Sequence, residues 1–364
     1  MGLSVPPLGE TVSVRIIDST SYITISADFI LSPHLPDFDT IHRIPCLVFL
    51  IEHPSGRKLL FDLGIRKDWQ NLAPVVANRV KELPVSINVE KSTLEVLADG
   101  GVREEDLEGI IWSHWHWDHI GDPSTFPPNV KVIVGPGFKD SLLPGYPANA
   151  EGRVLEADFA NRDLLEITDS DLTVQIGQFQ AHDYFGDGSF YILSTPGHAV
   201  GHISGLARTS KNPDTFIFMG GDLCHHAGQI RPSPLLPLPE IVEPNPFRHL
   251  SASPLSRIPC PGSLLESLQI PRSRKPTEPF FIPNDGYDIP QAIRTIEHAQ
   301  EADADDNVWF VYAHDASLLG VVDFYPNHVN NWKERNLSKK LKWEFVRDFK
   351  GAVERILTKQ EGER

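Results

Sequence analysis

Cysteine is scarce in this 364-residue sequence, which contains only Cys46, Cys224 and Cys260. Their number is odd, they lie far apart, and no two of them form a C-x-x-C pair. Disulfide frameworks and thiolate zinc sites need cysteines in matched numbers and at close spacings. We therefore expect neither of these, and we expect the three thiols to stay reduced.

Basic residues and long apolar runs are also in short supply. Lysine and arginine number 33 against 49 aspartates and glutamates, which gives a net charge of −16. So acidic a chain repels phosphate backbones, which argues against nucleic acid as a partner. No apolar run approaches the roughly 18 residues of a membrane span. The opening MGLSVPPLGETVSV lacks a signal peptide's basic start and apolar core, and Pro6 breaks the myristoylation pattern. These absences predict a cytoplasmic protein with no membrane or nucleic-acid partner.

Strand-like runs rich in β-branched and aromatic residues recur along the chain. They occupy residues 13–19, 22–31, 43–53, 58–64, 107–114, 130–136, 172–185, 190–197, 203–210, 215–222 and 307–315. The turn residues HPSG predict a hairpin at 53–56. Helices are predicted at 91–102, which ends in two glycines, at 288–300, with Asp288 as N-cap, and at 341–357. The last helix is predicted from one apolar face, made of Leu341, Phe345, Phe349, Val353 and Ile356.

Residues 228–284 differ from the rest because prolines and large apolar residues alternate there. One interpretation is a long surface connection. The other is an ordered insertion that packs near the active site as a lid or substrate wall, since leucine, isoleucine and phenylalanine recur too often for a disordered linker. In that case the wall would consist of Leu235, Leu236, Leu238, Phe247 and Leu250. The simplest organisation is a single domain, 1–364, carrying this insertion.

The stretch WSHWHWDHIGD, residues 112–122, places three histidines and an aspartate within six positions. It begins at the end of a predicted strand. Because residues two apart in extended chain point the same way, His114 and His116 can reach one metal ion. Asp118 and His119 follow after a turn and can reach a second point, while the intervening tryptophans would point away and pack. Imidazole and carboxylate together suit a borderline-soft ion such as Zn²⁺.

This His-x-His-x-Asp-His run resembles the signature of the metallo-β-lactamase superfamily. Further segments resemble that family in the same order along the chain: FDLG with Asp62 and Gly64, STPGHAVGH with His198, FMGGDLCHH with Asp222, and VYAHD with His314. The resemblance spans roughly residues 43–315. It implies an α/β fold, an αββα sandwich in which two mixed β-sheets are flanked by helices and the metals lie at one edge.

The resemblance also implies a ligand set for two metal ions. The first metal would take His114, His116 and His198, the second would take Asp118, His119 and His314, and Asp222 would bridge both. The usual occupants are two zinc ions, although other divalent metals can support such sites. His202 is expected to support the site rather than to bind metal.

In such a site a metal-bound hydroxide attacks a carbonyl, and Asp118 is expected to carry the proton to the leaving group. Asp315 and the overall layout resemble the lactonase branch that includes acyl-homoserine lactonases. The segment GGDLCHHAGQIRPSPLLPLP resembles fungal members, some of which open lactones or lactams such as benzoxazolinone. His225 stands where the bacterial lactonases have a substrate-contacting tyrosine, so it is a second candidate catalytic residue. Two interpretations of His225 and His226 stay open: both support the ligands or lie at the surface, or one of them faces the substrate.

The resulting hypothesis is a two-zinc hydrolase that opens the lactone or lactam ring of a small apolar molecule, with xenobiotic detoxification as its role. Two alternatives share the signature: a thioesterase of the glyoxalase II type, and a mononuclear iron dioxygenase acting on persulfides. A flavo-diiron oxidoreductase is rejected, because that group has glutamate where His116 stands. A binding protein without metal would be expected to have lost ligands, and all seven are present.

Overall fold

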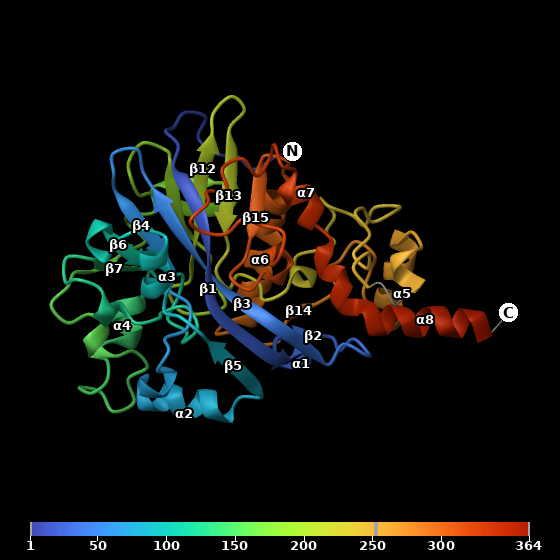
Figure 1. Cartoon of the computed structure of the whole chain (residues 1–364), viewed down its shortest axis with the longest axis horizontal. Coiled ribbons are helices and arrows are strands. Elements are labelled where there is room, and N and C mark those ends of the chain that lie inside the picture. The colour runs from blue at the N-terminus through green and yellow to red at the C-terminus, as the bar shows by residue number, and fades with distance from the viewer. Residues whose placement is uncertain (1, 251–253, 363–364) are drawn as a thin grey trace.

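The computed structural model describes residues 2–250 and 254–362 and contains two large sheets that face each other (Figure 1). The seven-stranded sheet has the order β5 (Val85–Val89), β1 (Ser13–Ser26), β3 (Thr40–Glu52), β4 (Lys58–Phe61), β6 (Gly109–Ile111), β7 (Lys131–Val134), β8 (Leu164–Glu166). The six-stranded sheet has the order β15 (Val308–Val311), β13 (Thr215–Met219), β12 (Ile203–Ser210), β11 (Phe190–Ser194), β10 (Phe179–Asp183), β9 (Val174–Ile176). A small ladder pairs β14 (Ile282–Pro283) with β2 (Leu31–Ser32).

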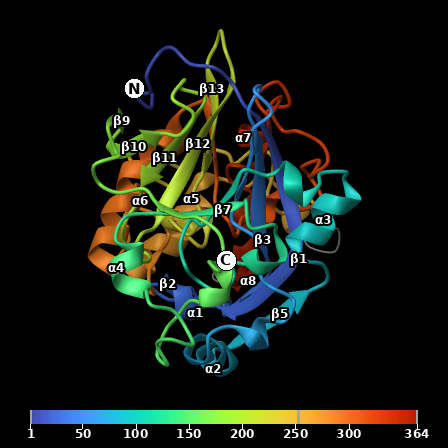
Figure 2. The ribbon, with the colours of Figure 1, turned by 90° about the vertical axis from the view of Figure 1, so that its left-hand side faces the viewer.

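Helices surround the two sheets and extend beyond them at one end of the molecule (Figure 1). They are α1 (Ala27–Ile30), α2 (Pro74–Glu82), α3 (Thr93–Asp99), α4 (Phe138–Leu142), α5 (Gly262–Gln269), α6 (Ile289–Ala304), α7 (Leu337–Leu341) and α8 (Lys350–Gly362). Figure 2 shows α3 outside the first sheet and α6 outside the second, with the two sheets between them. Both sheets mix parallel and antiparallel neighbours. The predicted αββα sandwich is confirmed.

Strict side-chain alternation along the central strands explains why the molecule has layers. In β3, Leu47, Phe49 and Ile51 enter the core between the two sheets, where they meet strands of the second sheet. Val48 and Leu50, between them in sequence, face the other way into the core under α3. A strand buried on both faces therefore reads as the continuous apolar run CLVFLI, as expected for the middle of a sandwich.

Several predicted elements form where the sequence places them. The hairpin turn joins β3 to β4 through His53, whose N–H donates to Arg57 O at 2.9 Å. Helix α3 begins with a capping box between Ser92 and Glu95 and stops at Gly100. Helix α6 begins at Asp288, whose carboxylate accepts from the N–H of Gln291.

The single helix expected at 341–357 is wrong in its details. The chain instead ends α7 at Leu341, forms a 3-10 helix over Glu344–Phe349, and only then enters α8. The predicted apolar positions are still the inward ones, since Phe345 and Phe349 are buried. They pack with Phe280 among neighbouring aromatic rings, so tertiary contacts bury the predicted face with a different backbone geometry.

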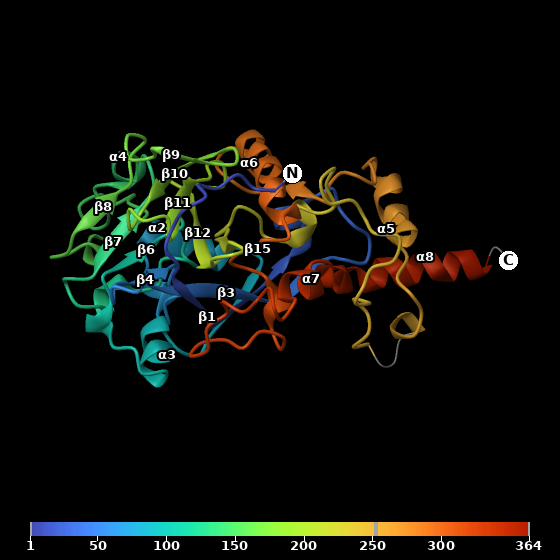
Figure 3. The ribbon, with the colours of Figure 1, turned by 90° about the horizontal axis from the view of Figure 1, so that it is seen from above.

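The proline-rich segment is ordered over its described residues and packs at one end of the molecule. Figure 3 shows α5 and α8 together at the end opposite α4 and β8. Val242, Phe247 and Leu265 are buried and belong to the same apolar core as Phe349 of the C-terminal region. The segment is therefore more than a surface connection, and the single-domain organisation stays a prediction. Within the described part of the chain, no helix is long and apolar enough to cross a membrane.

Candidate metal centre

The predicted ligands lie in loops that follow strand ends, at the edge where the two sheets approach each other. His114, His116, Asp118 and His119 follow β6 and His198 follows β11, while Asp222 follows β13 and His314 follows β15. Strands β13 and β15 are parallel neighbours, so their following loops emerge side by side. This placement holds the ligands on a rigid frame but leaves them open to a cavity.

Asp62 lies behind the loop that carries His114 to His119, which we call the histidine loop, and holds its shape through hydrogen bonds. Its carboxylate accepts hydrogen bonds from the Ser113 N–H at 2.7 Å and from His119 Nδ1 at 2.8 Å. With Nδ1 bound to this carboxylate, His119 presents Nε2 to the centre of the site. A carboxylate behind an imidazole both orients the ring and raises its basicity. Asp62, in the FDLG segment, therefore supports the loop that carries His119.

Gly221 allows the loop carrying Asp222 to approach the histidine loop closely. Its φ of 54° lies in the left-handed region, and a Cβ there would come within 2.8 Å of the Ser113 Cβ. A side chain at this position would therefore be strained and would also push Asp222 away from the histidines. The Gly-Gly-Asp sequence is thus a packing requirement of the site.

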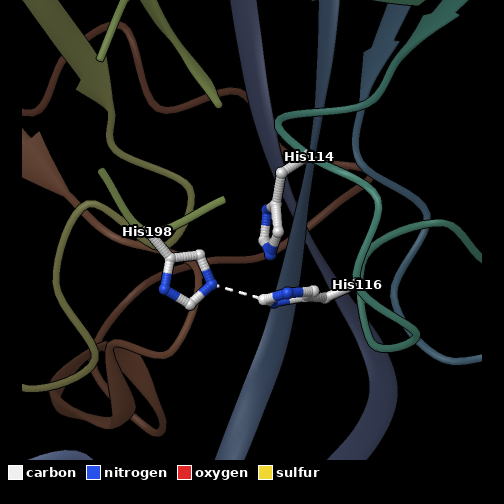
Figure 4. Close-up of side chains that lie close together, drawn as sticks. All are labelled: His114, His116 and His198. Atoms are coloured by element: carbon white, nitrogen blue, oxygen red, sulfur yellow. Dashed lines mark hydrogen bonds between the residues drawn. The ribbon is translucent and has the colours of Figure 1, made fainter. Parts of the chain in front are cut away.

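The first group of imidazoles consists of His114, His116 and His198, which converge from two loops (Figure 4). His116 Nδ1 and His198 Nε2 are 2.9 Å apart. The nitrogens of all three rings lie within 4.8 Å of one another, which is compatible with one shared cation. His114 and His198 are buried, and His116 is half-buried at the cavity.

The second group contains Asp118, His119, Asp222 and His314, again with ligand atoms within 4.8 Å of one another. Asp222 divides its two carboxylate oxygens between the groups. Its Oδ1 lies 3.2 Å from His119 Nε2 and 3.1 Å from His314 Nε2. Its Oδ2 faces the first group, at 3.6 Å from His198 Nε2. One carboxylate therefore stands between two sets of donors.

Buried polar atoms without partners converge on this centre. Among the described residues, His114 Nε2, His119 Nε2 and Asp222 Oδ1 have no hydrogen-bond partner although each is buried. Leaving such atoms unpaired costs about 1–3 kcal/mol each. Imidazole nitrogens and carboxylate oxygens are also the donors that zinc-type ions accept. The residues therefore fit a divalent metal.

The protonation states of the two groups differ. Burial lowers the pKa of His116 to about 3 and also lowers the pKa values of His114 and His198, so these rings are neutral. Burial opposes protonation of His119 and His314, but nearby groups together outweigh it and raise both pKa values, with the Asp222 charge as the largest raising cause. A cation would therefore meet neutral imidazoles in the first group and would displace protons from the second.

Three further histidines separate by their contacts. His202 accepts a hydrogen bond from the Asp222 N–H through Nε2 at 3.1 Å and contacts Thr195 O through Nδ1 at 2.9 Å, as expected for a supporting residue. His225 lines the cavity, and its Nε2 lies 3.3 Å from Asp222 Oδ2. His226 turns away into a group of aromatic rings that includes Phe349. Of the two adjacent histidines, His225 is the one that faces the cavity.

A cavity of about 880 Å³ opens from the centre. Its apolar lining comes from the ends of β1 and β3, from α1, and from α2 and β5: Ile23, Ile25, Phe29, Ile30, Ile44, Val75, Val76, Val80, Leu83 and Val85. No described residue of 228–284 lines it. The expected wall of Leu235, Leu236, Leu238, Phe247 and Leu250 is therefore wrong, because Phe247 is buried in the core beside α8 and Leu235 is exposed to solvent.

Part of this wall lies in elements that the sequence patterns do not predict. Helix α2 and strand β5 were not predicted, although Pro74 at the helix start and the alternation of VSINV were available signals. The tryptophans of the histidine run are a second correction. Trp115 and Trp117 line the cavity instead of pointing away from it. They screen one side of the centre and offer aromatic surface to a ligand.

Comparison with known proteins agrees with this geometry. The family model described as the metallo-beta-lactamase superfamily matches residues 43–209. Gamma-lactamase FDB1 of Fusarium pseudograminearum is 42% identical to this chain over 98% of the chain and 86% of the relative. Cytochrome P450 monooxygenase mpaDE' of Penicillium brevicompactum is 42% identical over 97% of the chain, but the match spans only 39% of that longer protein.

Among solved structures, a mutant of AiiA from B. thuringiensis, with N-decanoyl-L-homoserine bound at its active site, has a TM-score of 0.58. The match covers 88% of this chain and 100% of that chain at 16% sequence identity. At so low an identity the likeness establishes the fold, and the relatives with higher identity carry the family assignment.

Proposed function

Because this chain belongs to the metallo-beta-lactamase superfamily, we propose that it is a two-zinc hydrolase that opens a lactam or lactone ring. Membership and relatives make it a metal-dependent hydrolase. The observation that carries the two-metal proposal is Asp222, whose Oδ1 and Oδ2 face separate groups of donors. The lactam part of the proposal is supported by the gamma-lactamase name of its relative.

In the proposal each group holds one cation. His114, His116 and His198 hold the first, while Asp118, His119 and His314 hold the second and Asp222 bridges them. Two zinc ions would supply an acidified water as nucleophile and a Lewis acid for the carbonyl oxygen. Backbone contacts set which nitrogen each ring offers. His314, for example, donates Nδ1–H to Pro45 O at 2.9 Å and so directs Nε2 inward.

Asp118 is the proposed proton carrier. It lines the cavity, and its Oδ2 lies 3.5 Å from His314 Nε2. From this position at the cavity its carboxylate could pass a proton between the nucleophile and the leaving group. An amide nitrogen leaves poorly without a proton, so this transfer matters more for a lactam than for a lactone.

His225 is the proposed donor to the substrate. Its backbone N–H is held by Gln229 Oε1 at 2.7 Å, which fixes the ring at the cavity wall. We expect His225→Ala to lower turnover by roughly 10²–10⁴-fold, the range for loss of a general acid or base, while metal content stays unchanged. His225→Gln, which keeps a side-chain donor, should lose less. Unchanged turnover in the alanine variant would remove this role.

The cavity supports an apolar substrate. Its volume of about 880 Å³ falls within the range of about 300–1,000 Å³ of pockets for small organic molecules. Isoleucine and valine side chains make up much of its wall, and Trp115 and Trp117 add aromatic faces. A ring fused to an aromatic system would fit this lining. The detoxification role and the cytoplasmic location stay predictions.

Metal content decides between this proposal and its alternatives. Protein purified without added metal would be analysed for elements per chain and then assayed with lactones, lactams, thioesters and persulfides. About two zinc ions and opening of a ring would support the proposal. About one iron with oxygen consumption on persulfides would favour the dioxygenase. Two zinc ions with turnover of thioesters alone would favour an enzyme of the glyoxalase II type.

A further inference from the structure

Two arginines line the cavity of an otherwise acidic protein. Arg79 belongs to α2, and Arg153 lies in the loop between α4 and β8. Both are exposed, and neither forms an ion pair with a carboxylate among the residues that the structure describes. Most other arginines of the described chain have such a partner, for example Arg57 with Glu108 and Arg231 with Asp303. Two positively charged side chains that line a ligand cavity without a carboxylate partner therefore need a functional explanation.

Arg153 differs from Arg79 because an aromatic ring holds its position. Its guanidinium carbon lies 5.3 Å from the ring centroid of Trp115. Trp115 stands between the ligands His114 and His116 in sequence, and its ring centroid is 4.7 Å from that of His116. Stacking on an aromatic face pre-organises a guanidinium and leaves its N–H edge free. Arg153 therefore lies against Trp115, which in turn contacts the proposed ligand His116. Its N–H groups are available to a ligand in the cavity.

We propose that the ring substrate carries a carboxylate and that Arg153 binds it. This inference rests on the proposed ring-opening function and specifies its substrate class. A planar guanidinium matches a carboxylate with two parallel hydrogen bonds, which an ammonium or a neutral amide cannot reproduce. The reactive carbonyl would lie at the metal centre, the body of the substrate along the apolar wall, and the carboxylate at the N–H edge of Arg153.

The acidic residues that share the lining limit how much charge the substrate carries. Glu82, Glu151 and Asp285 also line the cavity. Their repulsion disfavours a substrate with several negative charges. It is compatible with a single carboxylate that reaches Arg153 directly, because contact at hydrogen-bond distance outweighs repulsion from more distant, hydrated charges. The inferred substrate is therefore a mono-anionic, mainly apolar ring compound.

The test compares matched compounds on the metal-loaded enzyme. Benzoxazolinone would be prepared with a carboxylate at each free position of its benzene ring in turn, and each product would be paired with the neutral carboxamide. At one position we expect kcat/KM to favour the carboxylate by roughly 10–100-fold, the worth of hydrogen bonds to a charged group. Arg153→Gln should abolish that preference, mainly through a raised KM for the carboxylate.

Arg79→Gln is the control, since it removes an unpaired cation from the same cavity without touching Trp115. It should keep the preference, and Arg153→Lys should keep only part of it. Equal turnover of carboxylate and carboxamide at every position would overturn the inference while leaving the ring-opening function intact. A preference that survives Arg153→Gln would also overturn it. If the wild-type enzyme opens none of these rings or of the wider lactone and lactam panel, the proposed function itself fails.

Discussion

The protein contains two buried clusters of ionisable groups, which differ in how their polar atoms are paired. In the candidate metal centre, buried nitrogen and oxygen atoms lie close together but have no hydrogen-bond partners among the described residues. In the second cluster, Arg231 Nε and Nη2 donate to Asp303, the Arg231 Nη1 donates to Lys342 O, and Lys342 Nζ donates to Asp303 O. Each charge there is met by another.

This difference in pairing distinguishes a ligand-binding site from an ion-pair cluster that holds parts of the fold together. The Arg231 cluster ties the start of the proline-rich segment to α6 and to the chain after α7, and its charges satisfy one another within the protein. Burial opposes ionisation of Asp303, but Arg231 and Lys342 together outweigh it and lower the carboxyl pKa to about 2. The candidate metal centre instead leaves buried donor atoms without hydrogen-bond partners among the described residues, as a cation site would. Buried charge by itself is therefore not a sign of function, whereas convergent unpaired donors are.

The largest expected effect is on the residue shared by both metal groups. Asp222→Asn keeps the side-chain volume but removes the negative charge between the two donor sets. We expect metal content to fall below two ions per chain and turnover to fall by more than about 100-fold, beyond the range seen for supporting residues. Elemental analysis and steady-state rates measure both. A variant that keeps two metals and full activity would contradict the bridging role.

Asp303→Asn should reverse this pattern. Removing one partner of a buried ion pair strands the charge of Arg231, which typically costs about 3–5 kcal/mol. We therefore expect urea denaturation to show a loss of stability of that order, while metal content and kcat/KM stay unchanged wherever the variant is folded. Loss of metal in this variant would erase the distinction between the two clusters.

Asp158 extends the comparison. Its carboxylate is buried, but it has no hydrogen-bond partner among the described residues and does not belong to the donor groups of the candidate metal centre. Both its carboxylate oxygens lack a hydrogen bond, and burial raises its pKa to about 7 although Arg66 opposes the shift. A folded pKa above the unfolded value near 3.9 means that the stabilising contribution is full below about pH 4 and is lost as the pH rises through 7.

The side chain that replaces Asp158 in Asp158→Asn cannot ionise. The free energy of unfolding of this variant should therefore not fall as the pH rises from about 4 through 7. We expect it to gain up to about 4 kcal/mol over the wild type between pH 4 and pH 8, and about nothing below pH 4. Denaturation curves at several pH values would measure the difference. A constant difference at all pH values would show that the pKa of Asp158 is the same in the folded and unfolded states.

The smallest expected effect concerns Asp62, whose carboxylate supports the loop that carries His119. Asp62→Asn removes the charge that holds His119 Nδ1 but leaves every metal ligand in place. Supporting carboxylates of this kind contribute about 10–100-fold to metal affinity. Competition with a chelator should show a weakening in that range, well short of the effect of Asp222→Asn. An effect as large as that one would make Asp62 a ligand in its own right.

Much of the metal centre could be predicted because its residues come in short, ordered motifs. The histidine run and the segments around His198, Asp222 and His314 each follow a strand, and the structure brings all of them to one edge. Sheet architecture makes this inference possible, because residues after neighbouring strands meet whatever the loops between them do. The two-layer core was similarly predictable from the continuous apolar strands.

The cavity wall could not be predicted in this way. The proline-rich segment has the large apolar residues of a wall, but those that become buried, such as Phe247 and Leu265, pack in the core beside α8 rather than over the candidate metal centre. The rest of the actual wall, beyond the ends of β1 and β3 and α1, comes from α2 and β5, whose signals are short and half-polar. Apolar periodicity shows that a face will be buried. It does not say which partner buries it, because that depends on contacts between distant parts of the chain.

The sequence by itself determined the donor atoms, their order along the strands and the family to which the chain belongs, since these depend on residue type and local spacing. Only the tertiary structure decided which histidine after Asp222 faces the cavity, which segment lines it, and that Arg153 stacks on Trp115. The physical reason is the same in each case. Local patterns fix what a residue can do, whereas long-range packing fixes what it meets.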